Sequence, residues 1–128
     1  MSGNNRVALV TGADSGIGEA VARCYAREGA AVVLSDVNQD SGEKAADAIR
    51  RSGGEAHFVV ADVSKPEDCE RMVRAAVERY GRLDWACNNA GIGGELALLA
   101  DYTVENWQRV IGVNLSALLC SCPESEIR

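Results

Sequence analysis

A glycine-rich run near the N-terminus constrains the fold of this chain more than any other feature. The run Thr11-Gly-Ala-Asp-Ser-Gly-Ile-Gly18 follows an apolar stretch, Val7–Val10, and precedes an alanine-rich segment with the pattern of a helix. Glycine allows a tight turn and a close approach of the backbone to a ligand. The first turn of a helix offers free N–H groups and the positive end of the helix dipole, which bind phosphate groups. The run therefore predicts a strand–turn–helix unit that holds the pyrophosphate of a dinucleotide.

The rest of the chain alternates between apolar strands and amphipathic helices. We predict strands at 7–10, 31–34, 56–61 and 83–87, and helices at 16–28, 41–51, 64–80 and 103–119. Ser64 and Glu67 have the spacing of a capping box at the start of the third helix. Apolar strands that alternate with helices are typical of a parallel sheet covered on both faces, with right-handed crossovers. We therefore expect an α/β domain with a doubly wound parallel sheet over residues 1–120, followed by an irregular polar tail at 121–128.

Composition limits the classes of partner. The chain has 128 residues and a net charge of −6, which argues against nucleic acid and anionic membranes, because both need clustered Lys and Arg. It has neither an apolar run of about 18 residues nor a signal peptide. An odd number of cysteines without a CxxC pair indicates reduced thiols, so we expect a cytoplasmic protein without a metal site. The cysteines at 24, 69 and 87 lie on apolar faces and are expected in the core.

Asp36 indicates which dinucleotide binds. It ends the second predicted strand, about 20 residues after the glycines, where an acid can accept hydrogen bonds from both hydroxyls of the adenosine ribose. A 2′-phosphate would meet an unpaired carboxylate there. Asp14 adds a second negative charge, and Val37 stands where a basic residue would favour NADP. We therefore expect NAD as the cofactor in preference to NADP; the alternative is that Asp36 is only a turn residue at a strand end.

Four motifs in order resemble those of the short-chain dehydrogenase/reductase family. They are Thr11-Gly-x-x-x-Gly-Ile-Gly18, Asp62-Val63, Asn88-Asn-Ala-Gly91 and Val113-Asn-Leu115. The resemblance covers about residues 5–119. It implies a Rossmann-like sheet with strand order 3-2-1-4, which in this chain ends after the helix that carries Asn114.

The resemblance also implies the site residues. The cofactor-binding positions would be Gly12, Asp14, Ser15, Gly16, Ile17, Gly18, Asp36, Val37, Asp62, Val63, Asn89, Ala90 and Gly91. Asp62 would bind the adenine amino group and Val63 would pack on its ring. Residues 89–91 would contact the nicotinamide ribose, and Asn88 would tie the central strand to its neighbours. Asn114 would disrupt its helix and order water in a proton relay, although a purely structural partner would also satisfy its side chain.

Members of the family transfer a hydride between NAD(P) and an alcohol or ketone. A tyrosine acts as acid and base, a lysine four residues later lowers the pKa of that tyrosine, and a serine holds the substrate oxygen. The sequence contains no Tyr-x-x-x-Lys, and no apolar strand follows the serines after Asn114. We therefore expect an oxidoreductase chain shortened after its cofactor-binding half and inactive alone. The alternatives are a non-catalytic NAD-binding module or partner of full-length relatives, and an active enzyme whose catalytic groups come from another subunit.

The predicted sheet also has an exposed edge. The fourth strand, Leu83–Cys87, is almost wholly apolar, and without a fifth strand its outer side would carry unpaired backbone groups. The last helix would leave Trp107, Ile111, Leu115 and Leu118 partly uncovered. Because apolar patches of this kind favour association, we expect a homo-oligomer or poor solubility.

Overall fold

The computed structural model of the protein describes residues 5–120 and contains a four-stranded parallel sheet. The strands follow the order β3-β2-β1-β4, as the sequence predicts. Their bounds are Val7–Thr11 for β1, Ala31–Asp36 for β2, Glu55–Val60 for β3 and Trp85–Cys87 for β4. The register pairs Leu9 of β1 with Val33 of β2 on one side and with Ala86 of β4 on the other.

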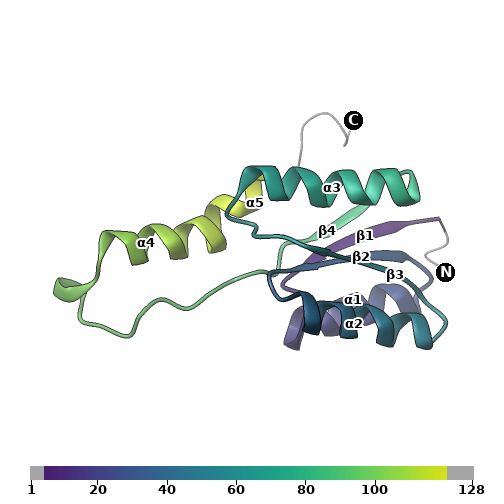
Figure 1. Ribbon diagram of the computed structural model, residues 1–128, viewed down its shortest axis with the longest axis horizontal. Coiled ribbons are helices and arrows are strands. Elements are labelled where there is room, and N and C mark those ends of the chain that lie inside the picture. The colour runs from purple at the N-terminus through teal and green to yellow at the C-terminus, as the bar shows by residue number, and fades with distance from the viewer. Residues whose placement is uncertain (1–4, 121–128) are drawn as a thin grey trace.

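Helices cover both faces of this sheet (Figure 1). Their bounds are Gly16–Arg27 for α1, Gln39–Arg51 for α2, Pro66–Tyr80 for α3, Val104–Ile111 for α4 and Ala117–Cys120 for α5. A short 3-10 helix, Leu99–Asp101, precedes α4, and α1 and α2 lie on the face opposite α3 and α5. The predicted doubly wound α/β sheet is therefore confirmed, whereas residues 121–128 of the expected tail lie outside the described residues.

Two apolar cores hold these layers together. Successive side chains of a strand point to opposite faces, and Leu9 and Val10 accordingly contribute to different cores. Leu9 packs with the α3 residue Met72, and Val10 packs with residues of α1 and α2. Both strand residues are fully buried, so β1 is the centre from which the layers are built.

The C-terminal helical segment is not one regular helix. A π-helical turn spans Gly112–Ser116, between α4 and α5, and it contains Asn114. Such turns inside α-helices are often found at functional sites. The disruption of this helix, which the family resemblance implies, is present at the expected residue.

Ser64 does not cap α3, and this prediction was wrong. The N-cap of α3 is Lys65, which makes no side-chain capping bond. The hydroxyl and the backbone N–H of Ser64 instead donate to Oδ1 of Asp62, at 2.6 and 2.9 Å. An ionised carboxylate two residues earlier is a strong local acceptor, so the aspartate turn forms in place of the capping box.

Cys24 is exposed, so its predicted place in the core was also wrong. The strip of α1 that faces the sheet carries Gly18 and Ala22, which are buried. Cys24 is two residues beyond Ala22, about 200° around the helix axis, and therefore points away from the sheet. Cys69 is buried as predicted, and Cys87 is partly buried.

Among residues 5–120 the strand β4 is an edge, as the sequence predicts, because within this range it pairs only with β1. It starts at Trp85, two residues later than expected. Just before it, Asp84 binds both backbone groups of Val7: its carboxylate accepts the Val7 N–H at 2.8 Å, and its own N–H donates to the Val7 carbonyl at 2.9 Å. Within residues 5–120, no helix is both long enough and apolar enough to cross a membrane.

Candidate dinucleotide-binding site

The glycine-rich run forms the turn between β1 and α1. Gly18 and Gly16 are required in this turn for different physical reasons. A Cβ on Gly18 would lie 2.1 Å from the carbonyl oxygen of Gly12, so α1 approaches the turn too closely for any other residue. Gly16 has a φ of +58°, which disfavours side chains. Space beside Gly16 is open to 4 Å. The turn is thus packed firmly on the protein side and open on the outer side.

The first turn of α1 keeps its N–H groups available. The first N–H groups of a helix have no partner within the helix. Ser15, the N-cap residue, makes no side-chain capping bond to them. These groups and the positive end of the helix dipole can bind a phosphate. Free N–H groups of this kind are what a turn needs in order to hold the pyrophosphate of a dinucleotide.

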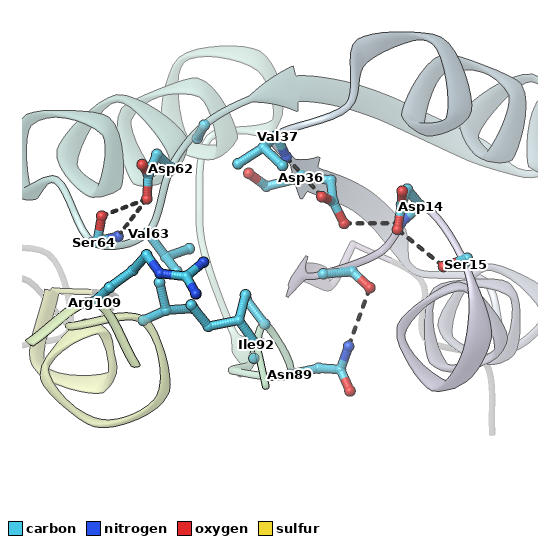
Figure 2. A pocket seen from close by; sticks show the side chains of 16 residues that line it. Asp14, Ser15, Asp36, Val37, Asp62, Val63, Ser64, Asn89, Ile92 and Arg109 are labelled. Carbon is cyan, nitrogen blue, oxygen red and sulfur yellow. Dashed lines mark hydrogen bonds between the residues drawn. The ribbon is translucent and has the colours of Figure 1, made fainter. Parts of the chain in front are cut away.

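A pocket of about 440 Å³ lies beside this turn, at the carboxyl ends of the parallel strands (Figure 2). Ligands bind at this edge in open α/β sheets. The lining residues come from the ends of all four strands and from α4 and the π-helical turn. They are Gly12, Asp14, Ser15, Ser35, Asp36, Val37, Ala61, Asp62, Val63, Ser64, Asn89, Ala90, Gly91, Ile92, Arg109 and Val113.

Ten of the predicted cofactor positions therefore line one pocket. The other three, Gly16, Ile17 and Gly18, form the first turn of α1, and the side chain of Ile17 is 75% exposed. The sequence reasoning missed six lining residues. Ser35, Ala61, Ser64 and Ile92 adjoin predicted positions, so their neighbours could have indicated them. Val113 belongs to the Val113-Asn-Leu115 motif and adjoins Asn114, which could have indicated it. Arg109 reaches the pocket only because the segment after β4 folds back, and no local signal marks it.

Asp36 and Asp14 lie side by side on one wall of the pocket (Figure 2). Oδ2 of Asp36 accepts the backbone N–H of Asp14 at 3.3 Å, and Oδ1 accepts the N–H of Val37 at 2.7 Å. Burial, followed by the side chain of the neighbouring Asp14, raises the pKa of Asp36, whereas the backbone N–H groups of Val37 and Asp14 act to lower it. Burial also acts to raise the pKa of Asp14, but hydrogen bonds, first that from the Ser41 hydroxyl, outweigh it and lower that pKa. The two neighbouring carboxyl groups therefore have pKa values shifted in opposite directions.

Asp62 lies on the opposite wall, after β3. Its Oδ1 is bound by Ser64, and this hydrogen bond is the main reason why the pKa of Asp62 is lowered. Its backbone N–H donates to the carboxylate of Asp68 at 2.8 Å. Among the described residues Oδ2 of Asp62 accepts no bond, which leaves it as an acceptor for a ligand.

Asn89 connects the glycine turn to the end of β4. Its side-chain amide donates to the carbonyls of Thr11 and Gly12 at 3.2 and 3.1 Å. The hydroxyl of Thr11 accepts the backbone N–H groups of Asn89 and Ala90, both at 3.1 Å. The prediction gave this tying role to Asn88, but Asn89 fills it, because its side-chain amide donates to both of these carbonyls of the turn.

The side chain of Asn114 pairs with the backbone of Ile92. Its Oδ1 accepts the N–H of Ile92 at 2.8 Å, and its Nδ2 donates to the Ile92 carbonyl at 2.9 Å. The π-helical turn therefore fixes the segment that follows Gly91. In this structure Asn114 has the structural partner that the sequence left open, and it positions one wall of the pocket.

This chain belongs to the short chain dehydrogenase family. The family model of that description matches residues 6–124. A cyclohexanol dehydrogenase of Acinetobacter sp. (strain SE19) is 45% identical over 118 residues, which are 92% of this chain and 47% of that protein. A 3beta-hydroxysteroid dehydrogenase of Mediterraneibacter gnavus is 38% identical over 121 residues, 94% of this chain and 44% of that protein. The chain thus spans about half the length of the curated relatives that it matches.

Solved structures of the family share the fold. A metagenomic short-chain oxidoreductase in complex with NADP superposes with a TM-score of 0.88 at 33% identity, over 92% of this chain and 53% of that one. A short chain dehydrogenase from Mycobacterium smegmatis gives a TM-score of 0.86 at 37% identity, over 92% of this chain and 50% of that one. The Rossmann-like sheet of this chain is therefore that of the family.

Proposed function

We propose that this chain forms the NAD-binding part of an oxidoreductase that transfers a hydride between NAD and a secondary alcohol or ketone. The proposal rests on one observation: residues of the open glycine turn and Asp36 line the same pocket. The turn offers N–H groups to a pyrophosphate, and Asp36 offers a carboxylate to a ribose. Bound NAD would supply the hydride acceptor.

The charges around the pocket support NAD over NADP. A 2′-phosphate near Asp36 would meet two carboxylates, since Asp14 lies beside it. Val37 lines the same wall and carries no charge. Arg109 is the single cation among the described lining residues, and it extends from α4 on the side of Asp62 and Ser64 (Figure 2). One structural neighbour was solved with NADP, so family membership alone leaves the choice open and the proposal rests on these side chains.

The names of two relatives support the substrate class. Cyclohexanol and a 3beta-hydroxysteroid are both cyclic secondary alcohols, and enzymes named for them match most of this chain. The segment after Gly91 carries the apolar side chains of Leu96, Leu98 and Leu99, all largely exposed. Apolar side chains of this kind would suit a ring carbon skeleton better than a charged substrate.

The residues of this chain bind and orient, and we propose that they do not complete the reaction. Asn89 and the Thr11 hydroxyl hold the end of β4 against the glycine turn, and Asn114 holds Ile92 at the pocket wall. The sequence offers no Tyr-x-x-x-Lys to carry the alcohol proton, and an unassisted phenol is a poor base at neutral pH. The 128 residues alone are therefore expected to bind NAD without turnover.

A role as a binding partner is the second candidate. The helices after the pocket expose large apolar side chains, among them Trp107 at 57%, Leu115 at 60% and Leu119 at 82%. Surfaces of this kind mark interaction sites. A non-catalytic module that joins longer relatives would use this face.

Calorimetric titration of the purified chain tests the proposal. We expect NAD to bind, NADP to bind more weakly, and no NADH to form with cyclohexanol or other cyclic secondary alcohols. Failure of both dinucleotides to bind would refute the proposed binding function. Formation of NADH by the chain alone would refute the expected lack of turnover.

A further inference from the structure

The hydroxyl group of Ser41, in α2, holds the carboxylate of Asp14 in the pocket. The Oγ of Ser41 donates to Oδ2 of Asp14 at 2.9 Å, across 27 residues of sequence. The Oγ of Ser15 donates to the other oxygen, Oδ1, at 3.1 Å. An aspartate in a turn has several staggered rotamers available. Two hydroxyl donors restrict Asp14 to one of them, so its charge has a fixed position on the wall of the pocket.

That position adjoins both Asp36 and the beginning of α2. The backbone N–H of Asp14 bonds to the carboxylate of Asp36 at 3.3 Å. Ser41 lies in the first turn of α2, where its own N–H is capped by Oδ1 of Asn38 at 3.0 Å. The positive end of a helix dipole attracts anions. The carboxylate of Asp14 therefore offsets the attraction that this helix end would otherwise have for a phosphate group close to Asp36.

We propose that Asp14, held in place by Ser41, is a specificity-determining residue that excludes a 2′-phosphate on the adenosine ribose. The inference rests on the proposed dinucleotide-binding function and adds to it a second determinant. Asp36 binds the ribose hydroxyls and loses them as partners when the 2′-oxygen is phosphorylated. Asp14 contributes repulsion alone, and Ser41 acts as the positioning residue that keeps this charge near the ribose. Discrimination is thus divided between two carboxylates with different tasks.

The two tasks predict different binding profiles. Asp14→Asn keeps the acceptor oxygen for Ser41 but removes the charge, so NADP should bind about five- to tenfold more tightly while NAD changes less than about twofold. Ser41→Ala keeps the charge but releases it, which should give a smaller gain for NADP of about two- to threefold. The double variant should match Asp14→Asn alone, because a neutral side chain leaves Ser41 no charge to position.

Titration calorimetry of the 128-residue chain with NAD and NADP measures these effects. Adenosine 2′,5′-bisphosphate and 5′-AMP serve as shorter probes that differ only at the 2′-position. Asp40→Asn is the matched control, since it also replaces an aspartate by asparagine and removes one negative charge. Asp40 is an exposed residue in the first turn of α2 and lies outside the pocket. The gain for NADP in Asp14→Asn should also shrink as salt is raised, which a change of packing would not do.

Several outcomes overturn the inference. They are an unchanged ratio of the two dissociation constants in Asp14→Asn, an equal shift in Asp40→Asn, or no effect of Ser41→Ala. Asp14→Ser replaces Asp14→Asn if circular dichroism shows that the latter fails to fold. Binding of NAD with an unchanged ratio refutes only the role of Asp14, whereas binding of neither dinucleotide refutes the proposed function itself.

Discussion

Removal of the Asp36 carboxylate is the most direct perturbation of the site. A hydrogen bond to a charged group contributes about 1.5–3 kcal/mol, so Asp36→Ala should weaken NAD binding roughly ten- to a hundredfold. NADP, which gains nothing from this carboxylate, should bind as well as before or more tightly. The ratio between the two dissociation constants should therefore fall by at least about tenfold, as measured by calorimetric titration of both dinucleotides.

The substitution also removes two acceptors of backbone N–H groups, those of Val37 and Asp14. Both donors lie near solvent, and water can replace the lost acceptor, so the free energy of unfolding should fall by no more than about 1–2 kcal/mol. Asp36→Asn is the control that keeps an acceptor at this position without the charge. An unchanged preference for NAD in a folded Asp36→Ala variant would refute the reasoning.

The pH dependence follows from the raised pKa of Asp36. The ionised carboxylate is the form that binds the ribose, so NAD affinity should decline as pH falls, starting above the ordinary aspartate pKa of 3.8. The contribution of Asp36 to folding stability changes with pH in the opposite direction. Because the native state holds the Asp36 proton more tightly than the unfolded state, this group stabilises the fold at low pH, and that contribution is lost as pH rises from 3.8 through the raised value. Asp36→Asn should abolish both effects.

Three further predictions concern stability and assembly. Asp84→Ala should lower the free energy of unfolding by about 1–3 kcal/mol in urea denaturation, because it leaves the Val7 N–H without its acceptor; Glu70→Ala, which removes only an exposed ion pair, should cost under about 1 kcal/mol. Gly42→Ala should destabilise by about 1–3 kcal/mol, since its Cβ would lie 2.0 Å from the buried Phe58 ring, and an unchanged melting temperature would contradict this packing. Sedimentation at micromolar concentration should show self-association through the exposed apolar side chains around α4, and a sharp monomer would count against it.

Much of the fold could be predicted because its signals are local. Apolar runs marked the four strands, the glycine run marked the first turn, and the family motifs in order implied the strand order 3-2-1-4 that the structure has. The errors arose where two local signals competed. Ser64 had the spacing of a cap, but its hydroxyl donates to the carboxylate of Asp62 instead. Cys24 lay in an apolar stretch, but it points away from the strip of α1 that meets the sheet.

The sequence by itself determined the glycine turn and the acids at strand ends, and its resemblance to the family implied the ten predicted residues that line the pocket. Only the tertiary structure decided how those residues pair. The hydroxyl of Ser41 reaches Asp14 because β2 runs parallel to β1 and α2 therefore begins at the edge where β1 ends. The amide of Asn114 reaches Ile92 because a π-helical turn directs it there. Side-chain pairs such as these depend on the direction in which separate elements meet, and no spacing along a single segment contains that information.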